Sequence, residues 1–281
     1  MSEFNAYIPD IDDSSKVIHH NHDCHELVLV ESGQVTFSIE NTLCEAGSHA
    51  LVIIGNLERH HIFVNSFPYR RRVMLIPNAF LTEKIRMPQL VSFFLYRPKG
   101  FEHVLHLEDA CYQKIEKHFD NIIAEFEGNL QLKEQRLEVL LELLLIDLCR
   151  SKYECFSWEN REDMNIVYQV QRYVSQNFTQ YITLSATAEK FHVSQYYLSH
   201  RFQNIAGYGF QQYLIFCRLN EAKRLLATTD LPVSILCEQC GYEDTNNFIR
   251  AFRKRESITP LQFRKTMKAH QAGAIMQSKS V

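Results

Sequence analysis

Hydrophobic positions follow two different spacings along the chain. Up to about residue 76 they occur in short runs roughly ten residues apart, broken by turn-forming residues, at 25–30, 34–39, 51–54 and 71–76. From about residue 107 onward they recur every three or four residues, the spacing of amphipathic helices. Short strands followed by helices predict a two-domain α+β chain, with a small N-terminal β-barrel, flanking helices and an all-α C-terminal domain.

Two helices, 107–126 and 130–150, are predicted after the strands and meet at Gly128-Asn129. The second helix is apolar over more than one stripe, and a helix that covers a barrel needs only one. We therefore expect one stripe to form a dimer interface, and the alternative is burial between the two domains. The interface residues predicted in this way are Leu137, Leu140, Leu144 and Leu148.

Residues 151–163 are polar and lack helical periodicity, which predicts a linker. The expected domains are then 1–150 and 164–268. The remaining residues, 269–281, are small and polar and are expected to form a disordered tail.

One pattern occurs twice, in 184–202 and in 233–252. Each copy predicts a short amphipathic helix, a tight turn and a second helix that begins after an N-capping side chain, Ser194 or Asp244. The copies are about 49 residues apart before the turn and 50 after it, and a long helix at 210–226 is predicted between them. Each copy is a helix-turn-helix candidate, and the ligand of that motif is the major groove of DNA.

The characteristic residues of this C-terminal segment are Ala188, Val193, Ser194, Leu198, Ser199, Phe202, Gly207, Tyr213, the run 218–226, Gly241, Tyr242, Phe248, Phe252, Arg253, Lys254, Thr259, Pro260, Phe263 and Arg264. In these residues the segment resembles the DNA-binding domain of the AraC/XylS family of bacterial transcription regulators. Two positions depart from the family pattern: Ser257 stands where Gly is usual, and His200 stands where a basic residue is common.

The outward residues of the two second helices are the predicted base readers. Apolar pairs four residues apart, Leu198/Phe202 and Phe248/Phe252, face the core and leave the polar residues between them exposed. Base contacts are expected from Gln195, Tyr196, Ser199 and His200 in the first copy, and from Thr245, Asn246, Ile249 and Arg250 in the second. Phosphate or helix-end contacts are expected from Arg201, Gln203, Arg218, Arg253 and Lys254.

The net charge of −3 looks unfavourable for a DNA-binding protein until it is divided between the domains. Residues 1–164 hold 16 Lys and Arg against 26 Asp and Glu, whereas residues 165–270 hold 13 against 7. A basic C-terminal half is expected when one domain neutralises phosphates. No apolar run is long enough to cross a bilayer and no signal peptide is recognisable, so we expect a cytoplasmic protein without a membrane partner.

The run from His20 to Gly33 resembles the first motif of the cupin barrels, and AraC-type regulators commonly carry a cupin-like sensor domain. We expect His20, His22, Glu26 and His60 to form an effector site inside the barrel, with neither cofactor nor metal. A metal-assisted site and a plain core remain alternatives. The basic run at 70–72 offers a phosphate or carboxylate clamp, but strand alternation places Arg71 alone on one face, so a solvated edge is favoured.

Cys237 and Cys240 have CxxC spacing, but both fall on positions that the repeat assigns to a helix core, so we interpret them as buried thiols. The sequence as a whole predicts a homodimeric, effector-responsive regulator of sugar or metabolite genes, an activator or a repressor rather than an enzyme. Its expected partners are double-stranded DNA, a small-molecule effector and RNA polymerase. Two alternatives stay open: a metal-dependent cupin enzyme fused to a DNA-binding module, and a constitutive regulator whose barrel is an interaction platform.

Overall fold

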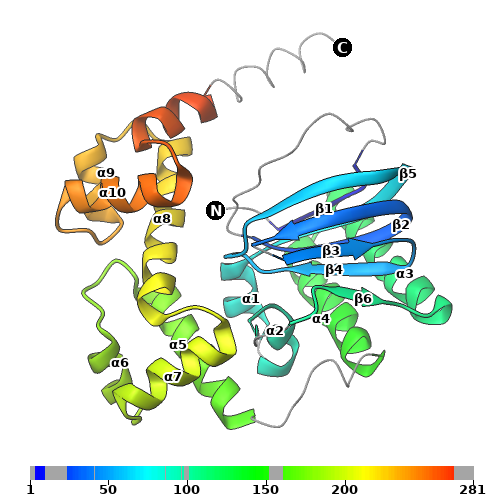
Figure 1. The fold of residues 1–281 in the computed structure, drawn as a ribbon, viewed down its shortest axis with the longest axis horizontal. Coiled ribbons are helices and arrows are strands. Elements are labelled where there is room, and N and C mark those ends of the chain that lie inside the picture. Colours follow the sequence, from blue (N-terminus) through cyan, green and yellow to red (C-terminus); the bar gives the residue numbers. More distant parts are fainter. Residues whose placement is uncertain are drawn as a thin grey trace. The chain divides into compact units, whose positions relative to one another are not determined.

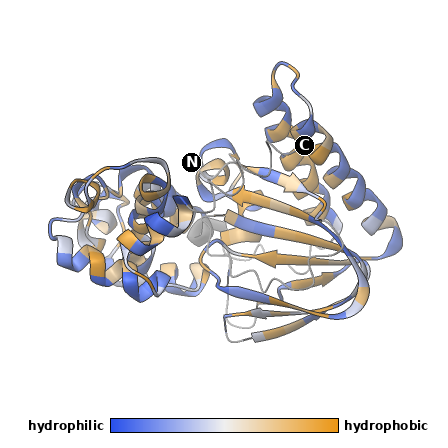
Figure 2. Ribbon diagram, turned by 90° about the horizontal axis from the view of Figure 1, so that it is seen from above, coloured by the Kyte–Doolittle hydropathy of each residue, from blue (hydrophilic) through white to orange (hydrophobic). Residues whose placement is uncertain are grey.

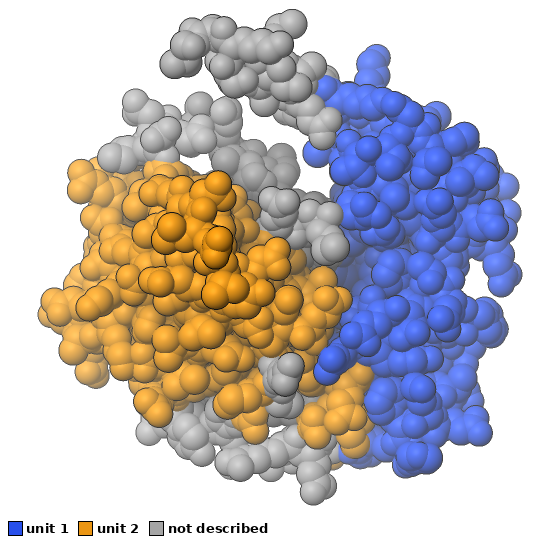
Figure 3. Space-filling model, turned by 180° about the vertical axis from the view of Figure 1, so that it is seen from behind, with its two compact units in different colours: residues 1, 170–200, 208–281 blue, residues 2–169, 201–207 orange. Residues whose placement is uncertain are grey.

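The computed structural model describes residues 4–9, 24–40, 42–85, 87–95, 97, 101–151 and 161–268. Two compact units are present, which Figure 3 colours separately: residues 2–169 with 201–207, and residues 1, 170–200 and 208–281. His20 and His22 lie outside the described residues, as do most of the predicted linker and the predicted tail.

The N-terminal unit is built on one antiparallel sheet with helices on one side (Figure 1). Its strands are β1 (Asn5–Tyr7), β2 (Cys24–Ile39), β3 (Thr42–Ala46), β4 (Ala50–Ile54), β5 (His60–Pro77) and β6 (Val104–His106). The order across the sheet is β1-β5-β2-β4-β6, with β3 paired to β2. Among the described residues this path is open, so the predicted barrel is a curled sheet whose end strands do not pair with each other.

Side chains alternate between two buried faces of the sheet. On β2, Leu27 and Leu29 belong to a core shared with the helices. Val28 and Val30 belong to a second apolar cluster on the opposite, inner face, together with Val73 of β5. Both faces are buried over residues 27–30 of β2 and over β4, so these segments are apolar at every position.

β2 continues through Ser32-Gly33, where the sequence suggested a turn. The ladder with β5 shifts register on both sides of Ser32, which is the signature of a β-bulge. Gly33 has a φ of +91°, and a Cβ there would lie 2.9 Å from the carbonyl oxygen of Ser66. The glycine therefore bends the strand without ending it, because only a residue lacking Cβ fits that conformation beside β5.

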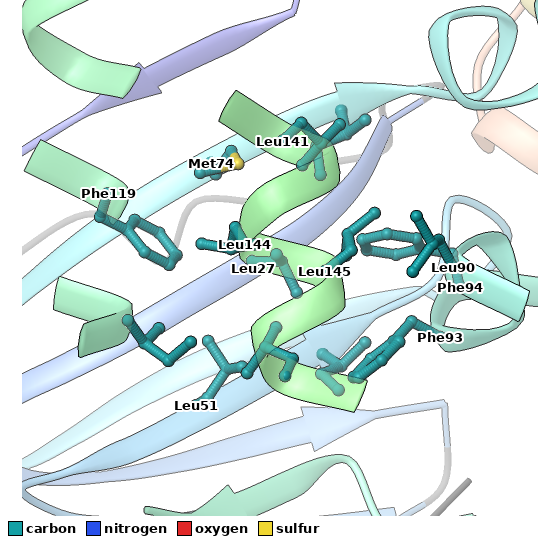
Figure 4. Packing of buried hydrophobic residues seen from close by; sticks show 14 of the residues in the cluster. Leu27, Leu51, Met74, Leu90, Phe93, Phe94, Phe119, Leu141, Leu144 and Leu145 are labelled. Atoms are coloured by element: carbon teal, nitrogen blue, oxygen red, sulfur yellow. The ribbon is translucent and has the colours of Figure 1, made fainter. Parts of the chain in front are cut away.

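In the described residues, the helices that accompany the sheet are α1 (Asn78–Lys84), α2 (Pro88–Leu95), α3 (Asp109–Glu127) and α4 (Lys133–Ser151). Figure 4 shows Leu141, Leu144 and Leu145 of α4 among side chains from the sheet, α2 and α3, including Met74 and Phe93. One helix thus fills the groove between several elements, which is why its apolar surface is wider than a single stripe.

This packing corrects the predicted dimer interface. Leu137 is 5% exposed, Leu144 and Leu148 are fully buried, and Leu140 packs partly buried against the same core. Leu137, Leu144 and Leu148 therefore have almost no surface left for a second subunit, whereas Leu140 keeps part of its surface exposed. The exposed apolar residues of α4 are Val139 and Leu143, at 55% and 44% exposure.

The C-terminal unit is helical, and its helices carry hydrophobic and hydrophilic residues in alternation (Figure 2). The helices of residues 161–268 are α5 (Arg161–Asn177), α6 (Leu184–Lys190), α7 (Gln195–Ala206), α8 (Phe210–Thr228), α9 (Val233–Gln239) and α10 (Thr245–Glu256), followed by a helix at 260–268. The predicted long helix is present as α8, and its inward residues, among them Tyr213 and Leu226, are buried.

The repeat is also visible in the hydrogen bonds. The amide of Val193 donates to the carbonyl of Ala188 at 3.0 Å, and the amide of Tyr242 donates to the carbonyl of Cys237 at 3.1 Å. The preceding turn residue has a positive φ in both copies, 56° at His192 and 80° at Gly241. The two turns therefore share one backbone design, although one uses a histidine where the other uses glycine.

The two cysteines of the CxxC run are buried, as predicted, at 2% and 0% exposure for Cys237 and Cys240. Burial raises the pKa of the Cys240 thiol to about 12, which disfavours the reactive thiolate. None of the helices in the described part of the chain is long and apolar enough to cross a membrane.

Candidate DNA interface and sensor site

The second helix of each repeat starts at the predicted cap. The Ser194 hydroxyl accepts from the amide of Tyr197 at 3.1 Å, and the Asp244 carboxylate accepts from the amide of Asn247 at 2.7 Å. Each cap satisfies an amide that the first helical turn would leave unpaired. Behind the caps, the apolar pairs Leu198/Phe202 and Phe248/Phe252 are fully buried, so the opposite faces of α7 and α10 point to solvent.

The exposed face of α7 is polar and aromatic. Gln195, Tyr196, Ser199 and His200 are all exposed, and Arg201 is partly buried. The rings of Tyr196 and His200 stack at a centroid distance of 6.0 Å and an angle of 17°. Tyr196 is 80% exposed, so the stack forms an outward ridge on the helix.

The exposed face of α10 is basic and amide-bearing. Asn246 and Arg250 are exposed, whereas Thr245 and Ile249 are partly buried beside them. Asn247 is exposed too, and its side-chain oxygen accepts from Arg250 Nη2 at 2.5 Å. The sequence predictions omitted Asn247, although its position three residues before Arg250 was the available signal. This contact orients the guanidinium while leaving its other N–H groups for a ligand.

Basic residues end α10, where Arg253 and Lys254 are exposed at the negative end of the helix dipole. For Arg218 the sequence predicts a contact either with a phosphate or with a helix end. Its Nε donates to the carbonyl of Phe178 at 2.8 Å and its Nη2 to that of Gln180 at 3.0 Å. Arg218 therefore fixes the loop that follows the C-terminal end of α5, which is a contact of the predicted helix-end kind.

Glu26, on the inner face of the sheet, meets His60. Glu26 Oε2 lies 3.0 Å from His60 Nε2, and both side chains are almost completely buried. Along β2, Glu26 is 13 positions from the residue paired with His60, about 40 Å in a flat strand. The contact is possible because the sheet curls over its inner face. Of the four predicted effector residues, Glu26 and His60 are therefore adjacent.

The charge state of this pair follows from its surroundings. Burial alone lowers the pKa of His60, but the contact with Glu26, its negative charge and the Glu58 carbonyl outweigh burial and raise it. His60 is therefore biased toward the imidazolium form that matches the Glu26 carboxylate. Among the described residues, no three His, Cys, Asp or Glu side chains are grouped as a metal site.

The helical fold and the duplicated helix-turn-helix unit together define a double helix-turn-helix domain, which is a DNA-binding module. Residues 187–266 match the helix-turn-helix domain family. Curated relatives of the chain are named helix-turn-helix transcriptional regulators. The C-terminal part of the chain therefore holds a helix-turn-helix domain, in agreement with the resemblance to the AraC/XylS family.

The chain is similar to the regulator YijO of Escherichia coli K12, with 31% identity over half of this chain and 49% of that protein. It is also similar to YisR of Bacillus subtilis, with 28% identity over 46% of this chain and 44% of that protein. The chain thus spans about half the length of these two relatives. A longer similarity, 23% identity over 87% of this chain and 86% of the other, links it to the transcriptional activator RhaS of Pectobacterium atrosepticum.

Among solved structures, ToxT of Vibrio cholerae has the same two-domain fold. The TM-score is 0.56, and the similarity covers 93% of this chain and 94% of ToxT at 13% sequence identity. This likeness concerns the fold, because so few residues are identical.

Proposed function

We propose that the protein is a transcription regulator that binds a specific double-stranded DNA site through α7 and α10, under the control of a small molecule bound by its N-terminal domain. The observation that carries the proposal is the pair of capped helices with exposed polar faces at the two ends of α8 (Figure 1). Such faces fit the major groove, which is wide enough for one helix.

The length of α8 supports binding by both units at once. Its 19 residues span about 28 Å at roughly 1.5 Å per residue. Adjacent major-groove segments on one face of DNA are about 34 Å apart, which is close to the length of α8. One copy of the chain is therefore suited to two successive major-groove segments.

The proposed sensor is the inner face of the sheet around Glu26 and His60. Buried charged groups need partners, and a small polar effector can supply some of them. A crystal structure of ToxT, which shares the fold, contains a bound unsaturated fatty acid. The name of RhaS as an activator supports activation, with RNA polymerase as a further partner.

We also retain the homodimer, with a different surface. Val139 and Leu143 lie four residues apart on the exposed side of α4, next to the partly buried Leu140 and Ile146. Apolar side chains at this spacing form a stripe that suits a second copy of the same helix. The residues of the buried stripe then support this interface from inside the domain.

Selection of duplexes from a random-sequence pool by the purified full-length protein tests the DNA-binding function. The enriched sequences should contain two conserved blocks about ten base pairs apart, because each reading helix specifies one block. Asn246→Ala should lose enrichment in one block only. A pool that shows no sequence preference at any salt concentration would refute a specific regulator. The metal content of the same preparation separates it from the metal-dependent enzyme alternative, which requires stoichiometric metal.

A further inference from the structure

Arg71 is the one member of the basic run 70–72 that faces the inner side of the sheet. It pairs in register with Val30, which belongs to the inner apolar cluster. Arg70 and Arg72 lie on the opposite face, where both pair with Glu31, at 3.8 and 3.2 Å. A basic run that looks like a solvated edge thus sends one guanidinium toward the apolar interior.

Arg71 packs against Tyr69. Its guanidinium carbon lies 4.7 Å from the centre of the Tyr69 ring. Tyr69 is only 3% exposed, and its hydroxyl has no hydrogen-bond partner among the described residues. Among the described residues, no carboxylate lies within ion-pair distance of Arg71. Native proteins satisfy nearly all buried polar groups, so an unpaired hydroxyl beside an unpaired cation indicates a place for a ligand.

The state of the tyrosines makes them donors. Burial is the largest cause that raises the pKa of Tyr69, and Glu26 raises it further, against the opposing effect of Arg71. Burial also raises the pKa of Tyr7, which pairs in register with Val73 and so lies on the same inner face. Both phenols stay protonated at neutral pH. One cation and two O–H donors therefore lie on the same face of the sheet as the inner apolar cluster.

We propose that Arg71 and the Tyr69 hydroxyl, assisted by Tyr7, bind the carboxylate of a small monoanionic effector whose apolar body lies on Val28, Val30 and Val73. This inference rests on the proposed sensor function and names its ligand class. A guanidinium and a neutral O–H donor match the two oxygens of one carboxylate.

Two features favour a monocarboxylate over a phosphate. A phosphate dianion carries two negative charges, and Arg71 would be the one guanidinium of this site to balance them. The Glu26 carboxylate is close enough to raise the pKa of both tyrosines, so its negative charge would also oppose a dianion. The charge of Glu26 itself is already met by His60. The surrounding valines favour a ligand whose remaining surface is apolar. Tyr7 is 37% exposed, which places the donors where solvent reaches the inner face.

Titration calorimetry of the full-length protein tests this with two matched pairs of probes, hexanoate with hexanamide and benzoate with benzamide. At least one acid should bind saturably and about tenfold or more tightly than its amide, because a charge-assisted contact is worth at least that factor. Arg71→Gln should abolish this preference, and Arg71→Lys should keep part of it. Tyr69→Phe should weaken acid binding several-fold and leave amide binding unchanged.

Arg70→Gln is the matched control, because it removes the same charge from the opposite face and should leave acid binding unchanged. Unaltered thermal unfolding of Arg71→Gln shows that the domain remains folded. Equal binding of acids and amides, absence of binding by both acids, or retained preference in Arg71→Gln would each overturn the carboxylate site. DNA affinity without probe is measured separately: if it is sequence-specific while no acid binds, the regulator stands and only the ligand class fails.

Discussion

At the scale of single residues, the second reading helix offers the sharpest chemistry. Arg250 is exposed and held by Asn247, which prepares its guanidinium for the bidentate contact that arginine makes with guanine. Arg250→Ala should cost about 1–3 kcal/mol on the selected site and relax the preference at one base pair. Binding to base-substituted duplexes measures this. Lys254→Ala is the control and should weaken all duplexes alike, so a uniform loss in Arg250→Ala would remove it from the base readers.

The Glu26–His60 pair predicts a pH dependence of stability. The pKa of His60 is raised in the folded protein. The pair therefore contributes fully to the free energy of unfolding at pH values below the unfolded-state pKa of about 6.5, and this contribution is lost as the pH rises through the folded-state pKa. The destabilisation caused by Glu26→Gln should therefore be largest near pH 5.5 to 6 and shrink toward pH 8.5. Denaturant unfolding at several pH values measures it.

A matched control uses the exposed pair of His49 and Asp109, whose atoms are 3.1 Å apart at 42% and 86% exposure. Asp109→Asn should change stability little at any pH, because solvent screens that pair. If the effect of Glu26→Gln were constant or grew with pH, His60 would not carry a raised pKa.

What the sequence reveals at this scale is position along a periodic element. Strand parity placed Glu26 on the inner face, and cap chemistry placed Ser194 and Asp244, because both depend on neighbours in the chain. The contact between Glu26 and His60 depends on how far the sheet curls. The sequence predicted that both belong to one site, but no fixed spacing in the chain determines that they meet. The unpaired Tyr69 hydroxyl depends on packing from several strands, which no local pattern encodes.

At the scale of elements, α4 carries both buried residues, which stabilise the domain, and exposed apolar residues, which suit a dimer interface. Leu144 is fully buried and Val139 is 55% exposed on the same helix. Leu144→Asp should cost the domain several kcal/mol, roughly 3–5, because it places a charge in an apolar core. Val139→Asp should change stability by about 0.5 kcal/mol or less and dissociate the proposed dimer. Unfolding and sedimentation measurements distinguish them, and an unchanged dimer in Val139→Asp would exclude this stripe.

The end of α10 offers a stabilising change. Ser257 caps the helix in the left-handed region, with a φ of 62°, where glycine is normal. Ser257→Gly should therefore raise the free energy of unfolding by about 1 kcal/mol. Gly241→Ser is the opposing control, since a Cβ there would lie 2.8 Å from the Phe178 carbonyl oxygen. A destabilised Ser257→Gly would mean that the serine side chain contributes more than the strain it imposes.

Element types and the repeat were predictable because they are written in local periodicity and caps. The width of the apolar surface of α4 was also visible, but its meaning was not. A second apolar stripe fits a dimer or a groove between elements equally well. The positions of α2 and α3 around α4 decide between them, and those are set by tertiary packing.

At the scale of the whole chain, the two halves differ in charge. Residues 165–270 carry an excess of basic residues, and the half before them an excess of acidic ones. DNA affinity of the full-length protein should fall steeply with salt, by a slope of about 0.9 per neutralised phosphate in a double-logarithmic plot. Lys254→Ala should reduce that slope by about 1. An affinity independent of salt would contradict a phosphate-neutralising domain.

The central claim is that α7 and α10 of one chain read two successive major-groove segments. Hydroxyl-radical footprinting of the full-length protein on its selected site tests this most directly. We predict two protected patches per protomer on one face of the duplex, centred about ten base pairs apart, with Asn246→Ala weakening one patch. A single short patch per protomer would contradict two working reading helices.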